Sequence, residues 1–224
     1  MRLIRISLIS TGLAVAGFLL PAWVPQAMAK IVCPPAAQAP SVTVRIKPGG
    51  VVTNNRQSHK GLRRLHKGRS TTKSAMGWNP VGLTSTELGF QMKVRVSAIP
   101  SQRNRYCGYL DSVDATVGYE KLTVYVARKY KPGSCHYESI MDHEQLHVMV
   151  FRRMLDRYAP RLERRITSAA ARLRPVVTSN AKQAASRLKN KLKQEIQPLF
   201  REMNQQLNRD NAKLDTPQNY KREQ

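Results

Sequence analysis

The sequence predicts an α+β fold, in which a short antiparallel β-sheet is followed by a helix and by a long, basic helical C-terminal region. Alternating apolar and polar residues occur only between residues 41 and 127. Apolar residues spaced three and four apart fill the region after residue 135. Strands and helices that are separated along the chain in this way are typical of α+β folds.

The first 29 residues have the pattern of a signal peptide. Arg2 and Arg5 form a positive start, residues 8–20 carry no charge, and the small residues before Lys30 fit a cleavage site after Ala29. An uncleaved anchor helix is the alternative, but two prolines and the short apolar run disfavour it. We therefore expect a secreted or periplasmic protein.

The chain is strongly basic, with 38 Lys and Arg against 14 Asp and Glu and a formal net charge of +24. A hydrophobic content of 41% excludes a wholly disordered chain, and a mean hydropathy of −0.46 excludes a multi-span membrane protein. Anionic lipid, lipopolysaccharide or acidic cell-wall polymer are the expected polyanion partners. Specific nucleic-acid binding is disfavoured by export and by an aromatic content of only 6%.

Three cysteines, Cys33, Cys107 and Cys135, allow three different single bridges in an oxidising compartment. Cys107 and Cys135 flank the strand-like segment 111–130, which favours a bridge between these two. Cys33 would then stay free in the N-terminal part of the mature chain.

Residues 30–40 are predicted to be a Pro/Ala-rich linker, and residues 41–175 to be the folded core. Ser41–Lys47 alternates like a strand, and the turn signal at residues 48–50 precedes two valines, which indicates a short strand or hairpin. The basic stretch 56–73 contains no acidic residue and is predicted to be a mobile loop.

Further strands are predicted at residues 92–99 and 122–127, which alternate between apolar and polar side chains. Both have the pattern of half-buried antiparallel strands. Residues 113–117 add a third candidate, which a turn at Gly118 would join to the strand 122–127.

A helix is predicted to begin near Cys135, with Ser134 as its N-cap, and it carries the sequence His143-Glu144-Gln145-Leu146-His147. The two histidines lie about 40° apart on one helical face, so both imidazoles can bind a single Zn²⁺. Glu144 directly follows His143 in the sequence and is placed to act as a general base toward water activated by the metal.

This HExxH motif is rare by chance, since a shuffled chain of this composition would contain roughly 0.004 copies. Its two histidines belong to one stripe of the helix, which consists of Ile140, His143, His147, Val150 and Met154. The alternative is a pair of buried, hydrogen-bonded core histidines without a metal.

The segment 106–162 contains Tyr-Cys-Gly-Tyr-Leu, Leu-Thr-Val-Tyr-Val-Ala and His-Glu-Gln-Leu-His-Val in this order, with Cys135 shortly before the motif. It resembles a bacterial family of predicted secreted zinc-dependent proteases, a domain of unknown function, over about 60 to 120 residues. The resemblance implies a zincin-like metallopeptidase with His143 and His147 as zinc ligands and Glu144 as base.

The third zinc ligand is not fixed by the motif, because the extension HExxHxxGxxH is absent at Val150 and Arg153. If the helical region folds back near Pro175, His143 and His147 lie opposite residues 203–210, since both arms rise about 1.5 Å per residue. This register favours Glu202 as the third ligand, or Asp210. The remaining alternatives are Glu163, Glu195 and Asp215.

Residues 176–224 are predicted to form a basic amphipathic helical extension that packs on the core. Nine apolar residues recur at steps of three and four: Val177, Ala181, Ala184, Leu188, Leu192, Ile196, Leu199, Met203 and Leu207. From residue 152 to the end, 18 basic residues face 7 acidic ones. This surface is suited to anionic envelope components, or is simply a solvated face.

The sequence therefore predicts an exported zinc metallopeptidase that hydrolyses peptide bonds of a peptide or protein substrate, with Glu144 as general base. Tyr137, Tyr158 and His136 are candidate donors to the oxyanion. The alternative is a non-catalytic, polyanion-binding envelope protein in which the motif is a structural or vestigial metal site.

Overall fold

The computed structural model describes residues 31–67 and 80–216. Its elements are β1 (Ser41–Lys47), β2 (Gly50–Asn54), α1 (His59–Lys67), β3 (Gly82–Ser101), β4 (Arg105–Val126), α2 (Cys135–Arg172), β5 (Val176–Thr178) and α3 (Ala181–Leu214). The structure thus combines helices with an open sheet of five strands. The signal peptide predicted over residues 1–29 lies outside the described residues.

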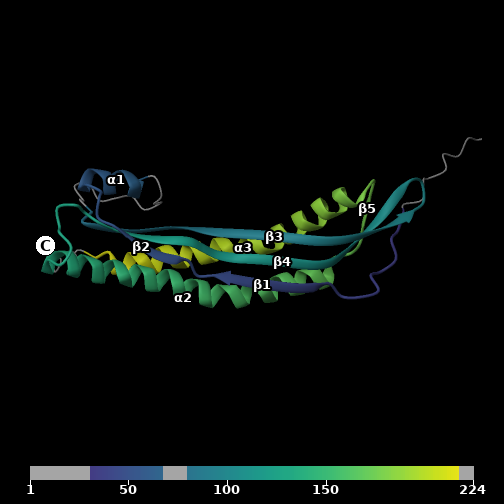
Figure 1. Ribbon diagram of the computed structural model, residues 1–224. Coiled ribbons are helices and arrows are strands. Elements are labelled where there is room, and N and C mark those ends of the chain that lie inside the picture. The colour runs from purple at the N-terminus through teal and green to yellow at the C-terminus, as the bar shows by residue number, and fades with distance from the viewer. Residues whose placement is uncertain (1–30, 68–79, 217–224) are drawn as a thin grey trace, which may run out of the picture. The chain divides into compact units, whose positions relative to one another are not determined.

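Strand β4 is the centre of the sheet (Figure 1). Strand β3 pairs with it antiparallel along almost its whole length, with Val94 opposite Val113. Three shorter strands pair with the other edge of β4: β5 runs antiparallel to it, and β1 and β2 run parallel to it. The sheet is therefore mixed, and not the short antiparallel sheet that the alternation of residues suggested.

The predicted strands 113–117 and 122–127 belong to one strand, because no turn interrupts β4 at Gly118. Gly118 has a φ of 152°, and a Cβ atom there would lie 1.9 Å from the carbonyl oxygen of Lys47. Glycine at this position allows the backbones of β1 and β4 to approach closely. Of the two alternatives after residue 41, the strand Ser41–Lys47 is confirmed as β1, and the hairpin is wrong, since β1 and β2 both pair with β4 and not with each other.

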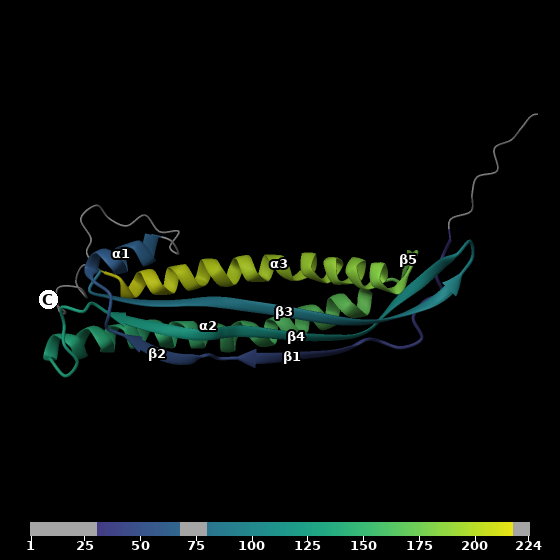
Figure 2. The same ribbon diagram turned by 45° about the horizontal axis from the view of Figure 1, so that its top comes forward.

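Helices α2 and α3 form a helical hairpin that covers one face of the sheet, as Figures 1 and 2 show. The core lies between the two layers and includes Val113, Val117 and Leu122 of β4. Leu155 and Ile166 of α2 and the α3 residues Leu188, Leu192 and Ile196 close it from the other side. The opposite face of the sheet is exposed at Thr43, Arg45, Lys93 and Arg95.

Both helices begin as local sequence rules require. The Ser134 side chain accepts a hydrogen bond from the backbone N–H of Tyr137, so the predicted N-cap is confirmed. The Asn180 side chain caps α3 in the same way. The chain folds back between the helices through β5, whose residue Val177 pairs with Cys107.

The disulfide joins Cys33 to Cys107, and Cys135 is free and exposed. The predicted bridge between Cys107 and Cys135 is therefore wrong. It rested on the two cysteines flanking the segment 111–130, but that segment belongs mostly to one long strand: Cys107 lies near the start of β4 and Cys135 follows its end. About 60 Å of extended strand separates these two positions.

Helix α1 was not predicted, since its residues fall in the basic stretch interpreted as a mobile loop. Leu62 of α1 is fully buried, and Ser58 precedes the helix and accepts a hydrogen bond from the Gly61 backbone N–H. Residues 68–73 of the predicted loop lie outside the described residues. None of the described helices is long and apolar enough to cross a membrane.

Candidate metal centre

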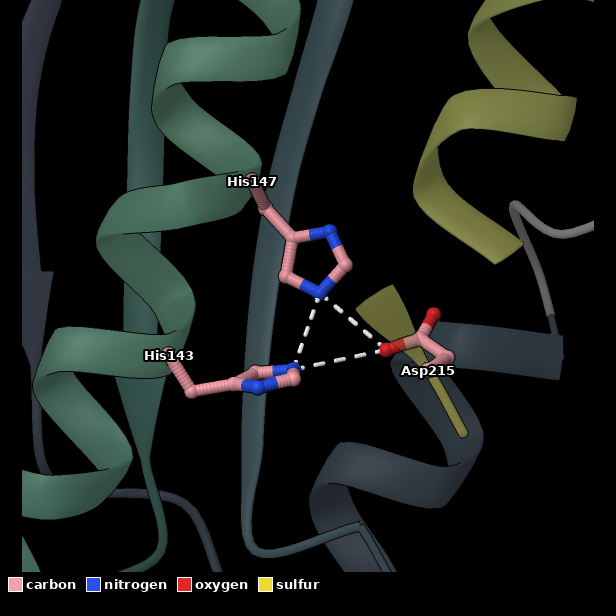
Figure 3. A group of neighbouring side chains, drawn as sticks. All are labelled: His143, His147 and Asp215. Atoms are coloured by element: carbon pink, nitrogen blue, oxygen red, sulfur yellow. Dashed lines mark hydrogen bonds and ion pairs between the residues drawn. The ribbon is translucent and has the colours of Figure 1, made fainter. Parts of the chain in front are cut away.

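His143 and His147 of α2 and Asp215 at the end of α3 converge at one end of the helical hairpin (Figure 3). The Nε2 atoms of the two histidines are 3.1 Å apart. Asp215 Oδ1 lies 3.1 Å from His147 Nε2 and 3.5 Å from His143 Nε2. The three residues form a group that could hold a metal ion.

The spacing of these donor atoms fits a small tetrahedral cation. Zinc bonds of about 2.0 to 2.1 Å, arranged as a tetrahedron, separate neighbouring ligand atoms by about 3.3 to 3.4 Å. The three observed separations of 3.1, 3.1 and 3.5 Å bracket this value. Two imidazole nitrogens and one carboxylate oxygen are also a donor set that zinc commonly takes in catalytic sites. Such a set leaves a fourth position for water or substrate.

Asn211 of α3 fixes the orientation of the His147 ring. Its side-chain Nδ2 donates to the Leu207 carbonyl, so Oδ1 faces His147 Nδ1 at 2.7 Å. Because this amide oxygen can only accept, Nδ1 carries the proton and Nε2 is directed at the metal centre. An outer hydrogen bond of this kind holds the imidazole in the orientation that metal binding needs.

Asp215 takes the place that the sequence analysis gave to Glu202. Helix α2 pairs with α3 about a centre near residue 180, as the pairs Arg165–Glu195 and Tyr158–Glu202 show. The predicted centre at Pro175 was about five residues too early, which displaces the partner on α3 by about ten residues, or 15 Å. His147 consequently lies opposite Asn211 and Asp215.

The Glu202 carboxylate is engaged elsewhere in the hairpin. Both of its oxygens accept hydrogen bonds from the Arg161 guanidinium, at 2.7 and 2.8 Å, and Oε1 also accepts from the Tyr158 hydroxyl at 2.9 Å. These three donors lower the pKa of Glu202, with Arg161 contributing most. Glu202 thus joins the two helices and is not part of the metal centre.

The other predicted carboxylates also lie outside the group. Asp210 accepts hydrogen bonds from Gln206 and Lys213 on its own helix. Glu195 forms ion pairs with two arginines of α2. Glu163 is exposed on α2. Among the candidates that the sequence left open, only Asp215 is brought to the two histidines in the described part of the chain.

Glu144 lies beside the metal centre and is buried, with 4% of its surface exposed. Its Oε2 accepts a hydrogen bond of 2.6 Å from the Thr84 hydroxyl at the start of β3. Burial raises the pKa of Glu144 to about 7, although His147, Thr84 and His143 oppose the shift. A carboxyl group with this pKa can both accept and release a proton near neutral pH.

Gly82 allows β3 to pass close to the Glu144 carboxylate. A Cβ atom on Gly82 would lie 2.4 Å from Glu144 Oε1 and 2.8 Å from a methyl carbon of Ile140. Any side chain at position 82 would therefore displace the carboxylate. Gly82 and Thr84 together hold Glu144 from the strand side.

The electrostatics of the site favour positive charge. Burial alone would lower the pKa of His147, but hydrogen bonds with Asp215 and Asn211 and the charges of Glu144 and Asp215 raise it to about 9. His66 of α1 also lies within reach of Asp215. Burial lowers the pKa of His66, and the Asp215 carboxylate opposes this shift.

None of the three candidate oxyanion donors belongs to the group of possible metal ligands in the described part of the chain. Tyr137 is buried in a cluster with Val81 and Ile140. The Tyr158 hydroxyl donates to Glu202, about three helical turns beyond His147. His136 is exposed and stacks on Tyr130, with ring centroids 6.1 Å apart.

The sequence did not predict four residues around the metal centre: Asn211, Thr84, Gly82 and His66. None belongs to a motif, and each reaches the site only through the pairing of elements distant in sequence. Asn211 had a usable signal, since it lies one helical turn before Asp215 on the same face.

Comparison with known proteins adds no relative: no family model, no curated protein and no solved structure matches the chain. The resemblance of the segment 106–162 to secreted zinc-dependent proteases therefore stays a prediction. The chemistry assigned to the site rests on the geometry of its own residues.

Proposed function

We propose that this chain is an exported zinc-dependent metallopeptidase. The observation that carries the proposal is the convergence of His143, His147 and Asp215 directly beside the buried carboxyl group of Glu144. His143, Glu144 and His147 form the HExxH motif on α2, in which the two histidines bind zinc and the glutamate serves as base. Hydrolysis of a peptide or protein substrate is the reaction that this combination supports best.

The ligands would be His143 Nε2, His147 Nε2 and Asp215 Oδ1, whose mutual distances suit a tetrahedral ion. When bound, zinc acts as a Lewis acid toward the substrate carbonyl and makes a coordinated water more acidic. The hydrogen bond from His147 Nδ1 to Asn211 supports this role, because it leaves Nε2 as the metal-binding atom.

Glu144 would move the protons of the reaction. Its carboxylate would accept a proton from the attacking water and deliver it to the leaving amine nitrogen. Thr84 and Gly82 keep the carboxylate in place from β3, so that its orientation does not depend on α2 alone. A general base of this kind typically contributes about 10²- to 10⁴-fold to the rate.

The competing proposal is a site that binds a metal, or no metal, without catalysis. A protonated His147 between Asp215 and Asn211 would hold the same atoms together through hydrogen bonds. In this arrangement the Glu144 carboxylate would serve only as a further negative charge beside the protonated His147. Burial of Glu144 is costly without a function, and it therefore favours the enzyme.

The test compares Glu144→Gln with Glu163→Gln in the purified chain beginning at Lys30. Both substitutions exchange a carboxylate for an amide on α2, but Glu163 is exposed and remote from the centre. We expect Glu144→Gln to keep one zinc per chain and to lose proteolysis of an unfolded protein substrate by about 100-fold or more. Glu163→Gln should retain both properties.

Proteolysis that persists in Glu144→Gln, or that resists removal of the metal by a chelator, would show that another site or a contaminating protease is responsible. A wild-type chain that binds zinc without hydrolysing any of a broad set of peptides would favour the structural metal site instead.

A further inference from the structure

The end of the helical hairpin opposite the metal centre carries many positively charged residues and no negatively charged ones. We call it the turn end, and it comprises residues 164–194, which include the end of α2, β5 and the start of α3. These residues contain nine Lys and Arg and no Asp or Glu. The members are Arg164, Arg165, Arg172, Arg174, Lys182, Arg187, Lys189, Lys191 and Lys193.

The sheet adds two further cations to this end. Strand β5 pairs with the first residues of β4, with Tyr106 opposite Thr178. The turn between β3 and β4 directly precedes the residues of β4 that pair with β5, so Arg103 of this turn and Arg105 of β4, both exposed, lie next to the turn end. Figure 1 shows β5 at this end of the sheet, away from α1.

Most of this charge is directed to solvent. Arg165 and Arg172 share the Glu195 carboxylate, and Arg187 donates to the Val177 carbonyl. The six remaining cations of the turn end form no ion pair with a described carboxylate: Arg164, Arg174, Lys182, Lys189, Lys191 and Lys193. All six are exposed except Lys189, which is partly buried. Helical rotation places Lys182, Lys189 and Lys193 on one flank of α3, and Arg187 and Lys191 on the other.

We infer that the turn end binds the anionic phospholipid surface of a membrane. A cluster of Lys and Arg on two flanks of a helix and on a neighbouring strand turn presents charge over an area, which suits a planar field of headgroups. Among the described residues 164–194, no large apolar side chain is strongly exposed. The contact with the membrane would therefore be electrostatic and peripheral.

Two observations favour lipid over nucleic acid as the partner. The turn end contains no aromatic residue on which bases could stack. The sequence also predicts export, which places the chain next to an anionic membrane surface and away from most nucleic acid. The inference uses neither Glu144 nor the zinc ligands, so it stands or falls independently of the proposed peptidase activity.

The experiment measures binding of the chain beginning at Lys30, which contains the compact unit Ile31–Gln224. Sedimentation with vesicles of phosphatidylcholine is compared with vesicles that also contain phosphatidylglycerol, at about 0.1 M salt. One variant carries Arg174→Gln, Lys182→Gln, Lys191→Gln and Lys193→Gln. The matched control carries Lys93→Gln, Arg95→Gln, Lys121→Gln and Lys131→Gln, which remove the same four charges from exposed positions elsewhere.

We expect the wild type to bind only the anionic vesicles, the turn-end variant to bind about tenfold or more weakly, and the control to change by less than about threefold. Equal weakening in both variants would mean that net charge alone is responsible and would overturn the inference. Failure of the wild type to bind the anionic vesicles, or tighter binding to duplex DNA at the same salt concentration, would also overturn it. Circular dichroism establishes that both variants are folded.

Discussion

The two ends of the helical hairpin differ in charge although they belong to the same two helices. At the metal-centre end, residues 135–163 of α2 and 195–215 of α3 and its cap contain seven Lys and Arg and nine Asp and Glu. At the turn end, residues 164–194 contain nine Lys and Arg and no acid. About 37 Å of helix separates His147 from Arg172.

This difference teaches that the net charge of +24 is not spread evenly over the molecule. Three of the carboxylates at the metal-centre end have partners: Asp215 lies beside two histidines, Glu202 pairs with Arg161, and Glu195 pairs with two arginines. The turn end keeps the surplus of positive charge. We interpret one end as a site for a cation and the other as a surface for anions.

The largest effect is expected from Asp215→Ala, which removes one of the three donor atoms. Zinc affinity should fall by more than the roughly 100-fold that the loss of an outer hydrogen bond can cost. Asp156→Ala is the control, because it removes an exposed carboxylate from the same end of the hairpin. Competition with a zinc-binding dye measures both. If the two variants bind zinc equally well, Asp215 is not a zinc ligand and interacts with the histidines only electrostatically.

Asn211→Ala should have the next largest effect. Without the amide oxygen at 2.7 Å, His147 loses the partner that fixes its ring, and zinc affinity should fall by about 10- to 100-fold. Asn190→Ala makes the same change on the exposed surface of α3 at the turn end and should leave zinc affinity unchanged. Unaltered affinity in Asn211→Ala would remove this residue from the site.

Gly82→Ala tests the close approach of β3 to Glu144. The added methyl group would meet the carboxylate at 2.4 Å, so we expect a loss of roughly 1–3 kcal/mol in the free energy of unfolding. Proteolysis should fall with it. Gly50→Ala, where no atom lies within 4 Å of the added carbon, should be close to neutral. Urea unfolding measures the stability of both variants. Equal stability would show that β3 can shift away from Glu144 at no cost in free energy.

The stability of the zinc-free protein should depend on pH through His147 and Glu144. The folded-state pKa of His147 is raised to about 9 from 6.5, and that of Glu144 to about 7 from 4.5. In each case the folded protein holds the proton more tightly, so the stabilisation is present below the lower value and lost as pH rises through the higher one. The free energy of unfolding should therefore fall by several kcal/mol between about pH 5 and 9, since each unit of pKa shift corresponds to about 1.4 kcal/mol.

Urea unfolding of the chelated protein at a series of pH values measures this fall. The variant His147→Gln should lose the part that His147 causes and keep the part that Glu144 causes, shifted to higher pH because the His147 charge no longer lowers the pKa of Glu144. A free energy of unfolding that rises over this interval would contradict the charges assigned to the site.

The local features of the fold were predictable because they depend on neighbouring residues. The N-cap at Ser134, the helix after it and the fold-back of the helical region follow from side chains within a few positions. The parallel pairing of β1 and β2 with β4 does not, since alternation shows which side chains share a face and not which strands are neighbours. The disulfide was mispredicted for a related reason, because the position of two cysteines on either side of a strand-like segment does not show which cysteine lies close in space.

The residues of the candidate site also differ in how far they could be predicted from the sequence. His143, Glu144 and His147 lie on one helix, so their arrangement follows from helical geometry alone. Asp215 and Asn211 depend on the register between two helices, where an error of five residues in the turn selects the wrong carboxylate. Thr84 and Gly82 depend on the sheet, which no local pattern specifies.

The central claim is that His143, His147 and Asp215 bind one metal ion, and the metal content of the purified protein tests it most directly. The chain beginning at Lys30 is loaded with zinc, freed of excess by gel filtration and analysed by mass spectrometry of its metals. We predict one zinc per chain in the wild type and none in the variant His143→Ala/His147→Ala. A wild-type chain without zinc, or a variant with the same zinc content, would contradict the account.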